Sequence, residues 1–307
     1  MIACVFSGQG SQKPGMGQEL CAQSQAARAV YAAAADFLGF DLLTMDEEQL
    51  AQTRFAQLSI VTMSLAAWAA FKESAGDLPT TAFAGFSLGE YSVLGAAGVL
   101  TLIDLLTLVN ERARLMQAAS DATPGVMYAV MGMDDAQLLE VVSQPQFAGK
   151  VYAVNFNCPG QTVIAGLEEP AAACVEALTA AGARKIRRLN VSGAFHTPLM
   201  QPAADQLTAF ARSLTFSQPG GTVYSNTSGL PLPADTDWPS YLALHMCSPV
   251  RWTEEVSNLR QDGADAFFEF GPGKVLTGLI RKITPESVVQ PVEDSRTLAE
   301  ALTALNL

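Results

Sequence analysis

A serine between two glycines is the first feature of this 307-residue chain that could do chemistry. Gly85, Ser87 and Gly89 form a Gly-x-Ser-x-Gly motif, after a predicted strand at residues 81–84 and before a predicted helix at 88–99. This context is typical of a sharp, strained turn that presents a serine nucleophile at a helix N-terminus. The free N–H groups there favour a developing oxyanion. A strand-to-helix turn that contains a serine without chemistry is the alternative.

A serine nucleophile needs a proton acceptor, and histidine suits that task near neutral pH. The chain has two histidines, His196 and His245. His196 precedes Thr197, a good N-cap, and Pro198, a good first helical residue, so we expect it just outside a helix start. A nearby helix N-terminus disfavours imidazolium and keeps the ring able to accept a proton. A capping-region histidine without chemistry is the alternative. His245 lies near a predicted helix end, and no carboxylate flanks it in the sequence.

Composition excludes several classes of protein. The net charge of −12 argues against a nucleic-acid partner, because phosphates require a basic surface. The five cysteines are scattered, without a Cys-x-x-Cys pair, which indicates a reducing compartment and neither a disulfide framework nor a zinc site. Residues 1–6 resemble a first strand and not a signal peptide. No apolar run approaches the roughly 20 residues of a membrane helix. We expect a soluble cytoplasmic protein that contacts no membrane.

One basic run departs from the acidic balance. Arg184, Lys185, Arg187 and Arg188 fall within five residues. They could meet an anionic partner, and a solvated charge run at a strand edge is the equal alternative.

The elements that position these residues alternate between strands and helices. Residues 57–72 are apolar almost all round, which indicates a buried helix. Further strands are predicted at 1–6, 222–225 and 266–270, and further helices from Pro198, Lys274 and Leu298. Such alternation is typical of an α/β layer architecture.

A different rhythm occupies the middle of the chain. Strands at 126–133, 151–157, 162–165 and 186–191, with helices at about 134–143 and 168–181, give the order strand-helix-strand-strand-helix-strand. That order is the ferredoxin-like arrangement. We predict a core of residues 1–123 and 192–307 with an inserted subdomain at 124–191.

Seven segments in order carry a resemblance that runs essentially end to end. They are 6–12 (Phe-Ser-Gly-Gln-Gly-Ser-Gln), the serine motif with 90–92, Glu111-Arg112, 154–161, 193–196, 248–252 and 270–276. With these segments the chain resembles the malonyl-CoA:acyl carrier protein transacylases of fatty-acid synthesis and the related polyketide acyltransferase domains. The resemblance implies an α/β-hydrolase-like core with a ferredoxin-like insertion. It also implies that Ser87 is the nucleophile, His196 the base, and the backbone N–H groups of Gln9 and Leu88 the oxyanion hole.

The resemblance also implies binding residues. Arg112 resembles an arginine that clamps the free carboxylate of malonyl, a group that its planar fork suits. A surface or ion-paired arginine, like Arg114, is the alternative. Phe195 resembles the malonyl-selecting type, in which bulk opposes an α-methyl branch by about 1–3 kcal/mol. Asn157 and Gln161 line the mouth of the site or form a polar hairpin turn.

Two residues depart from the family pattern. Phe86 stands at the position before the nucleophile, where the family usually has histidine. The resemblance therefore does not predict which contacts this residue makes with the acyl group or the pantetheine near the entrance. His245 stands where Gln or Asn is common, at a position whose backbone carbonyl orients the catalytic histidine. A carbonyl role is indifferent to the side chain, but His245 adds a second titrating group.

The resemblance predicts transfer of malonyl from malonyl-CoA to the phosphopantetheine thiol of an acyl carrier protein through a malonyl-serine intermediate. We expect a monomer without metal or redox cofactor. The alternatives are a free-standing acyltransferase of a polyketide synthase, a serine thioesterase or esterase, and a non-catalytic module that binds carrier proteins.

Overall fold

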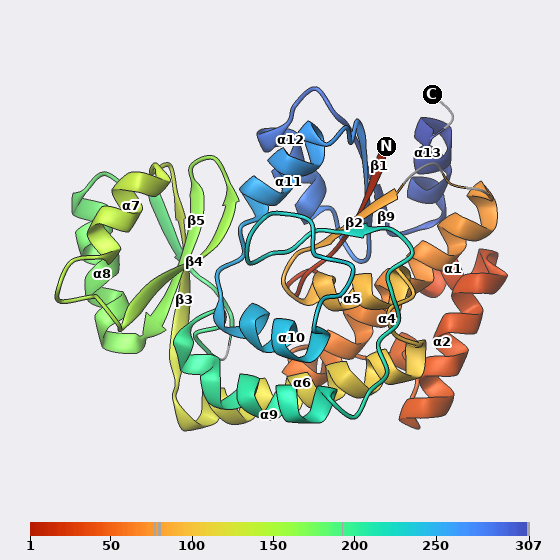
Figure 1. Cartoon of the computed structure of the whole chain (residues 1–307), viewed down its shortest axis with the longest axis horizontal. Coiled ribbons are helices and arrows are strands. Elements are labelled where there is room, and N and C mark those ends of the chain that lie inside the picture. Colours follow the sequence, from red (N-terminus) through yellow and green to blue (C-terminus); the bar gives the residue numbers. More distant parts are fainter. Residues whose placement is uncertain (77, 79–80, 192, 306–307) are drawn as a thin grey trace.

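A parallel sheet forms the centre of the larger lobe (Figure 1) in the computed structural model, which describes residues 1–76, 78, 81–191 and 193–305. Its strands lie in the order β7 (Thr222–Val223), β2 (Thr81–Gly85), β1 (Ile2–Phe6), β8 (Ala266–Phe270) and β9 (Val288–Val292). Every neighbouring pair is parallel. All five residues of β1 are buried, as expected of a central strand covered on both faces.

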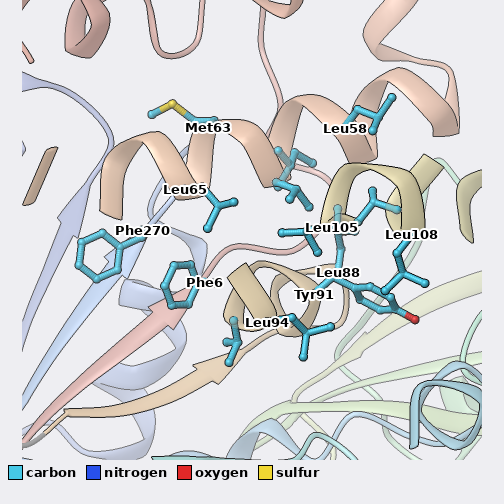
Figure 2. Close-up of a cluster of buried hydrophobic side chains, with 14 of the residues drawn as sticks. Phe6, Leu58, Met63, Leu65, Leu88, Tyr91, Leu94, Leu105, Leu108 and Phe270 are labelled. Atoms are coloured by element: carbon cyan, nitrogen blue, oxygen red, sulfur yellow. The ribbon is translucent and has the colours of Figure 1, made fainter. Parts of the chain in front are cut away.

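Helices cover both faces of this sheet. Cys4 and Phe6 of β1 belong to a core with α2 (Gln25–Leu38), α4 (Thr53–Ala75), α5 (Leu88–Ala96) and α6 (Leu102–Ala122). Figure 2 shows part of this core, with Leu65 of α4 pointing from that helix toward α5. Ala3 and Val5 face a second core with α11 (Trp252–Gln261) and α12 (Val275–Ile283). The sheet is therefore the middle layer of three.

Helix α4 corrects one expectation. It has 23 residues and an 18-residue window with a mean hydropathy of 1.2, so by length and composition it could cross a membrane. The expectation that no apolar run approaches this length was wrong. However, 83% of that window is buried inside the protein, as predicted for a helix that is apolar all round. Among the described residues, α4 is the one helix that passes this test.

A separate antiparallel sheet forms the smaller lobe, in the order β4 (Val151–Cys158), β5 (Gln161–Leu167), β3 (Gly125–Met131) and β6 (Lys185–Arg188). Two helices, α7 (Asp135–Val142) and α8 (Glu168–Ala180), pack on one face. The chain order β3-α7-β4-β5-α8-β6 is the predicted order. Met127 and Val163 on the other face pack against the core of the larger lobe. Figure 1 shows this lobe at the left.

Backbone hydrogen bonds join the two lobes. The Phe156 N–H donates to Val250 O at 2.9 Å, and the Val250 N–H donates to Val154 O at 2.8 Å. Strand β4 therefore pairs side by side with the segment before α11, through a parallel bridge between Asn155 and Val250. The division at residues 124–191 stays a prediction, and Ser192, its predicted boundary, lies outside the described residues.

The remaining elements are α1 (Gln18–Gln23), η1 (Leu42–Thr44), α3 (Glu47–Leu50), η2 (Pro198–Met200), α9 (Gln201–Ala211), α10 (Trp238–Cys247) and α13 (Ser295–Leu305).

Several predicted boundaries were wrong. The strand expected at 186–191 ends at Arg188, because the following residues turn into the cavity between the lobes. The strand expected at 222–225 ends at Val223, and the helix expected from Leu298 begins at Ser295. Helices α1, α2, α3, α6 and α11 and strand β9 were not predicted.

Candidate active site

Ser87 occupies the turn between β2 and α5, with φ 53° and ψ −107°. The sharp turn predicted from the glycines is present. A Cβ on Gly85 would lie 2.2 Å from the Gly89 carbonyl carbon, and a Cβ on Gly89 would lie 2.0 Å from the Phe6 carbonyl oxygen. Both contacts are to backbone, which cannot move aside cheaply. The two glycines are therefore required by the close approach of β1, β2 and α5.

His196 meets the serine across 109 residues of sequence. Its Nε2 lies 2.7 Å from Ser87 Oγ. His196 has φ 61°, and within the described ranges Ser87 and His196 are the two residues other than glycine with positive φ. Such strain persists where the surrounding structure over-determines it and is concentrated at functional sites. Thr197 caps the following turn by accepting from the Leu199 N–H at 3.2 Å, as predicted.

Two backbone carbonyls orient the imidazole. His196 Nδ1 lies 3.3 Å from the His245 carbonyl oxygen and 3.1 Å from that of Ser248. Carbonyls only accept hydrogen bonds, so Nδ1 carries the proton and Nε2 is free to accept from the Ser87 hydroxyl. The His245 carbonyl contact was expected from the family resemblance. The Ser248 contact was missed, since no side-chain pattern indicates a carbonyl.

Burial keeps the His196 ring neutral. Burial, and after it the nearby Arg112 charge, together lower the pKa of His196 to about 4. The neutral ring was predicted, but from a helix N-terminus. The larger cause is burial. Only 5% of the residue is exposed, so an imidazolium at this position would lose its hydration.

The His245 side chain points away from the chemistry. Its Nε2 lies 3.4 Å from Glu90 Oε2 and its ring centroid 5.5 Å from that of His196. Burial, then the charges of His196 and Arg112, hold the pKa of His245 well below its usual value. Burial raises the pKa of Glu90 to about 8. The second titrating group is thus a neutral histidine that packs behind the base.

Arg112 is a buried cation in α6, 2% exposed. Its Nη1 donates to Gln57 Oε1 at 2.7 Å, and its guanidinium carbon lies 4.6 Å from the Tyr91 ring centroid. Its Nε has no hydrogen-bond partner, and no described carboxylate forms an ion pair with it. An unpaired buried charge is costly, so this geometry favours an anionic ligand.

Arg114 shows the contrasting case. It is exposed and pairs with Glu111 at 2.6 Å, which makes it the ion-paired surface arginine. The partners of Arg112 were missed by sequence reasoning. Gln57 offered a signal, since it is a polar residue inside an apolar helix.

A cavity of about 310 Å³ between the lobes brings the predicted side chains together. Its walls include Gln9, Phe86, Ser87, Leu88, Arg112, Asn157, Gln161, Phe195 and His196. Of the predicted site residues, His245 alone is not on the wall, which fits a contribution through its carbonyl. Across the described part of the chain, no group of three or more His, Cys, Asp or Glu side chains could hold a metal ion.

The N–H groups of Gln9 and Leu88 are available to a ligand. Neither donates to an acceptor among the described residues. The Gln9 loop lies directly against the serine turn, because a Cβ on Gly8 would lie 2.6 Å from the Phe86 carbonyl oxygen. Two such donors beside a nucleophile are the arrangement that stabilises a tetrahedral oxyanion.

Apolar and amide groups form the rest of the wall. The Phe86 ring packs edge-on against Trp252, with centroids 5.7 Å apart. Asn155 and Asn157 are buried with side-chain oxygens that lack a partner, so each has an unused acceptor. Asn155 was not predicted as a site residue. The cavity thus offers acceptors for a polar ligand as well as apolar surface.

Comparison with known proteins shows one consistent likeness. The family described as acyl transferase domain matches residues 3–300. A malonyl CoA-acyl carrier protein transacylase of Salmonella typhimurium is 37% identical over 309 residues, covering 98% of this chain and 99% of that protein.

Two solved structures have the same fold. The malonyl-CoA:acyl carrier protein transacylase of Xanthomonas oryzae pv. oryzae has a TM-score of 0.93 at 37% identity, covering 99% of this chain and 98% of that one. A malonyl-transacylase in complex with its type II PKS acyl-carrier protein has a TM-score of 0.91 at 36% identity, covering 99% of each chain.

The pH dependence of Ser87 reactivity follows from the burial of His196. We expect the neutral ring to act as the base, so reactivity should be lost as the pH falls through the His196 pKa of about 4. We expect the second-order rate of modification by a neutral fluorophosphonate to be level between pH 8 and about 5.5 and to fall only below that. Arg112→Gln should move the fall to higher pH, because it removes a repelling cation. A midpoint near 6.5 in the unsubstituted protein would contradict this account.

Proposed function

The chain belongs to the malonyl CoA-acyl carrier protein transacylases of the acyl transferase domain family, and from this membership we propose that it moves malonyl from malonyl-CoA to the phosphopantetheine thiol of an acyl carrier protein. The observation that carries the proposal is Arg112, a buried cation without an anion, in one cavity with the Ser87 and His196 pair. A serine hydrolase for neutral esters would have no use for that charge.

Acylation begins when the malonyl carboxylate pairs with Arg112, which places the thioester carbonyl beside Ser87. His196 Nε2 takes the hydroxyl proton as Ser87 Oγ bonds to the carbonyl carbon. The carbonyl oxygen becomes an oxyanion held by the N–H groups of Gln9 and Leu88. As the carbon–sulfur bond breaks, His196 returns the proton to the leaving CoA thiolate, and malonyl remains as an ester of Ser87.

The second half reverses these roles. The carrier protein's phosphopantetheine thiol enters the same cavity and loses its proton to His196. Its sulfur bonds to the ester carbonyl, the bond to Ser87 Oγ breaks, and His196 reprotonates the serine. Pairing with Arg112 throughout keeps the acyl carbonyl against the oxyanion donors.

The remaining wall residues fit this ligand. Phe195 opposes an α-methyl branch and so favours malonyl. Asn157 and Gln161 face the pantetheine arm with amide groups, and Phe86 gives that arm an apolar contact where relatives of this type usually place histidine. The carbonyl of His245 orients the base.

The proposal extends to architecture and setting. We assign an α/β-hydrolase-like core to residues 1–123 and 192–307 and a ferredoxin-like subdomain to 124–191, supported by the parallel sheet and the β3-α7-β4-β5-α8-β6 order. We infer a cytoplasmic monomer that serves fatty-acid synthesis. Service to a polyketide synthase is the second candidate, favoured by the likeness to the type II PKS transacylase. Transfer rates to purified carrier proteins of the two pathways distinguish them.

Ser87→Ala tests the covalent intermediate. Intact-mass measurement should find malonyl on the unsubstituted protein after malonyl-CoA is added, and its loss once a holo carrier protein follows. The alanine variant should gain no malonyl, because the alanine has no oxygen to acylate. Malonyl on folded Ser87→Ala would refute the assignment, and release of free malonate without a carrier protein would instead indicate a thioesterase.

Arg112→Gln tests malonyl recognition, with Arg114→Gln as the matched control. The loss of a desolvated charge pair should lower malonyl transfer by the equivalent of about 2–5 kcal/mol, whereas acetyl transfer should survive. The measurement is the ratio of kcat/KM for malonyl-CoA and acetyl-CoA. Arg114 is already paired with Glu111, so its variant should keep that ratio. An unchanged ratio in Arg112→Gln would remove this residue from the site.

Substitutions on the two faces of β6 test whether its basic residues bind the carrier protein. Arg187 lies opposite Ala129 in the strand register, so its side chain is on the sheet face toward the larger lobe. Arg188 is on the other face and forms a salt bridge with Glu168 of α8 at 2.5 Å. Arg187→Glu with Lys185→Glu should lower kcat/KM for an acidic carrier protein roughly tenfold at low salt, through slower association. Acylation by malonyl-CoA should change less, and Arg188→Glu should have the smaller effect on transfer. Equal losses in both half-reactions would show that the run is only solvated.

A further inference from the structure

Asn226 binds the backbone of the serine turn at the nucleophile and two residues before it. It is fully buried and lies just beyond β7. Its Oδ1 accepts from the Ser87 N–H at 2.7 Å, and its Nδ2 donates to the Gly85 carbonyl oxygen at 2.6 Å. One side-chain amide thus contacts the residue before the turn and the nucleophile itself.

This amide continues the sheet where the main chain leaves it. Strand β7 pairs with β2 up to Val223, and the Tyr224 N–H donates to Phe83 O at 2.8 Å. Beyond that point, the Asn226 side chain supplies the next acceptor and donor to β2. On the other side, the Phe86 N–H donates to Phe6 O of β1 at 3.0 Å. The turn is therefore held by the main chain of β1 on one side and by the Asn226 side chain on the other.

The surroundings fix which way the amide points. Nδ2 also donates to Glu255 Oε2 at 2.8 Å, while His245 Nε2 lies 3.3 Å from Oδ1. The backbone N–H of Asn226 donates to Glu90 Oε2 at 3.1 Å. A flipped amide would set its oxygen against the Gly85 carbonyl oxygen and the Glu255 side chain, so one orientation is allowed.

The contact has two consequences for chemistry. It occupies the Ser87 N–H, which leaves the oxyanion to Gln9 and Leu88. It also holds Ser87 at a φ that an L-residue disfavours, and this backbone angle sets where Oγ starts from. We propose that Asn226 is a positioning residue for acylation, which keeps Ser87 Oγ aimed at the substrate carbonyl. The proposal rests on the proposed function, since it needs Ser87 as nucleophile.

Two substitutions of Asn226 separate positioning from folding. Asn226→Ala removes both contacts. Asn226→Asp keeps the shape, and as a neutral acid it can accept from the Ser87 N–H and donate to the Gly85 carbonyl, whereas the ionised form cannot donate. The titratable groups facing this position are Glu90 from α5, His245 and Tyr241 from α10, and Glu255 from α11.

Asn258→Ala is the matched control. Asn258 Nδ2 donates to the Gly229 carbonyl oxygen at 2.8 Å, and the Gly229 N–H donates to Ser225 O at 2.7 Å. This variant therefore loosens the turn that carries Asn226 without touching the Ser87 backbone. All variants are compared as full-length protein, with folding checked by circular dichroism at the assay temperature.

The readout is the single-turnover rate of malonyl-serine formation from malonyl-CoA, as a function of its concentration and of pH. Because misplacing a reacting group by about 1 Å costs about 100-fold, we expect Asn226→Ala to lose about that factor in rate at saturation. Half-saturation should be unchanged, since Arg112 is intact. Asn258→Ala should keep the rate. The rate of Asn226→Asp relative to the unsubstituted protein should fall as pH rises from 5 to 8 and the new carboxyl ionises.

Each result decides the proposal. A folded Asn226→Ala that acylates at the unsubstituted rate overturns it, and so does an equal loss in Asn258→Ala. If Asn226→Ala does not fold, the Asn226→Asp ratio decides alone, and a ratio independent of pH overturns the positioning role. If the unsubstituted protein forms no malonyl-serine, the proposed function fails, and the Asn226 proposal falls with it for that separate reason.

Discussion

The hydrogen bond between Ser87 Oγ and His196 Nε2 joins two residues that are each held in a disfavoured backbone conformation. Neither conformation is stable by itself, so the surrounding fold must impose both. Strand β1 and the glycines of the serine turn fix one partner, and the capped turn after His196 fixes the other. The two-lobed arrangement supplies this constraint, because the cavity that contains the pair lies between a parallel sheet and an antiparallel one.

The charge of Arg112 acts on this hydrogen bond as well, because it lowers the pKa of His196. The guanidinium has a neutral amide and an aromatic face as neighbours instead of a carboxylate. A carboxylate partner from the protein would satisfy the cation and would also repel an anionic acyl group. The fold instead tolerates a buried cation, partly compensated by Gln57 and Tyr91, at the position where we propose that the substrate carboxylate binds.

Local patterns predicted the serine turn, the capped turn after His196 and the strand-helix order of the smaller lobe, because each depends on a few adjacent residues. The family resemblance supplied Arg112 and the carbonyl of His245, which no local pattern distinguishes. Long-range partners stayed hidden: Gln57, Ser248 and Asn226 contact the site through the folding of distant segments. Helix α6 was missed although it carries Arg112, since its polar and apolar residues are mixed. The early end of β6 reflects tertiary packing at the cavity.

Under the proposed function, binding of the substrate changes the pKa of His196, the group that accepts the Ser87 proton. In the free protein the Arg112 cation adds to burial in lowering the pKa of His196 to about 4. A carboxylate that pairs with Arg112 cancels that repulsion, so the His196 pKa rises toward the range in which an imidazole accepts a proton most effectively. Two neutral carbonyls at Nδ1 leave this response intact, whereas a buried carboxylate there would hold the pKa high in every state. Under the proposed function, an acyl group without a free carboxylate would meet a weaker base, so selectivity for malonyl would arise in the chemical step as well as in binding.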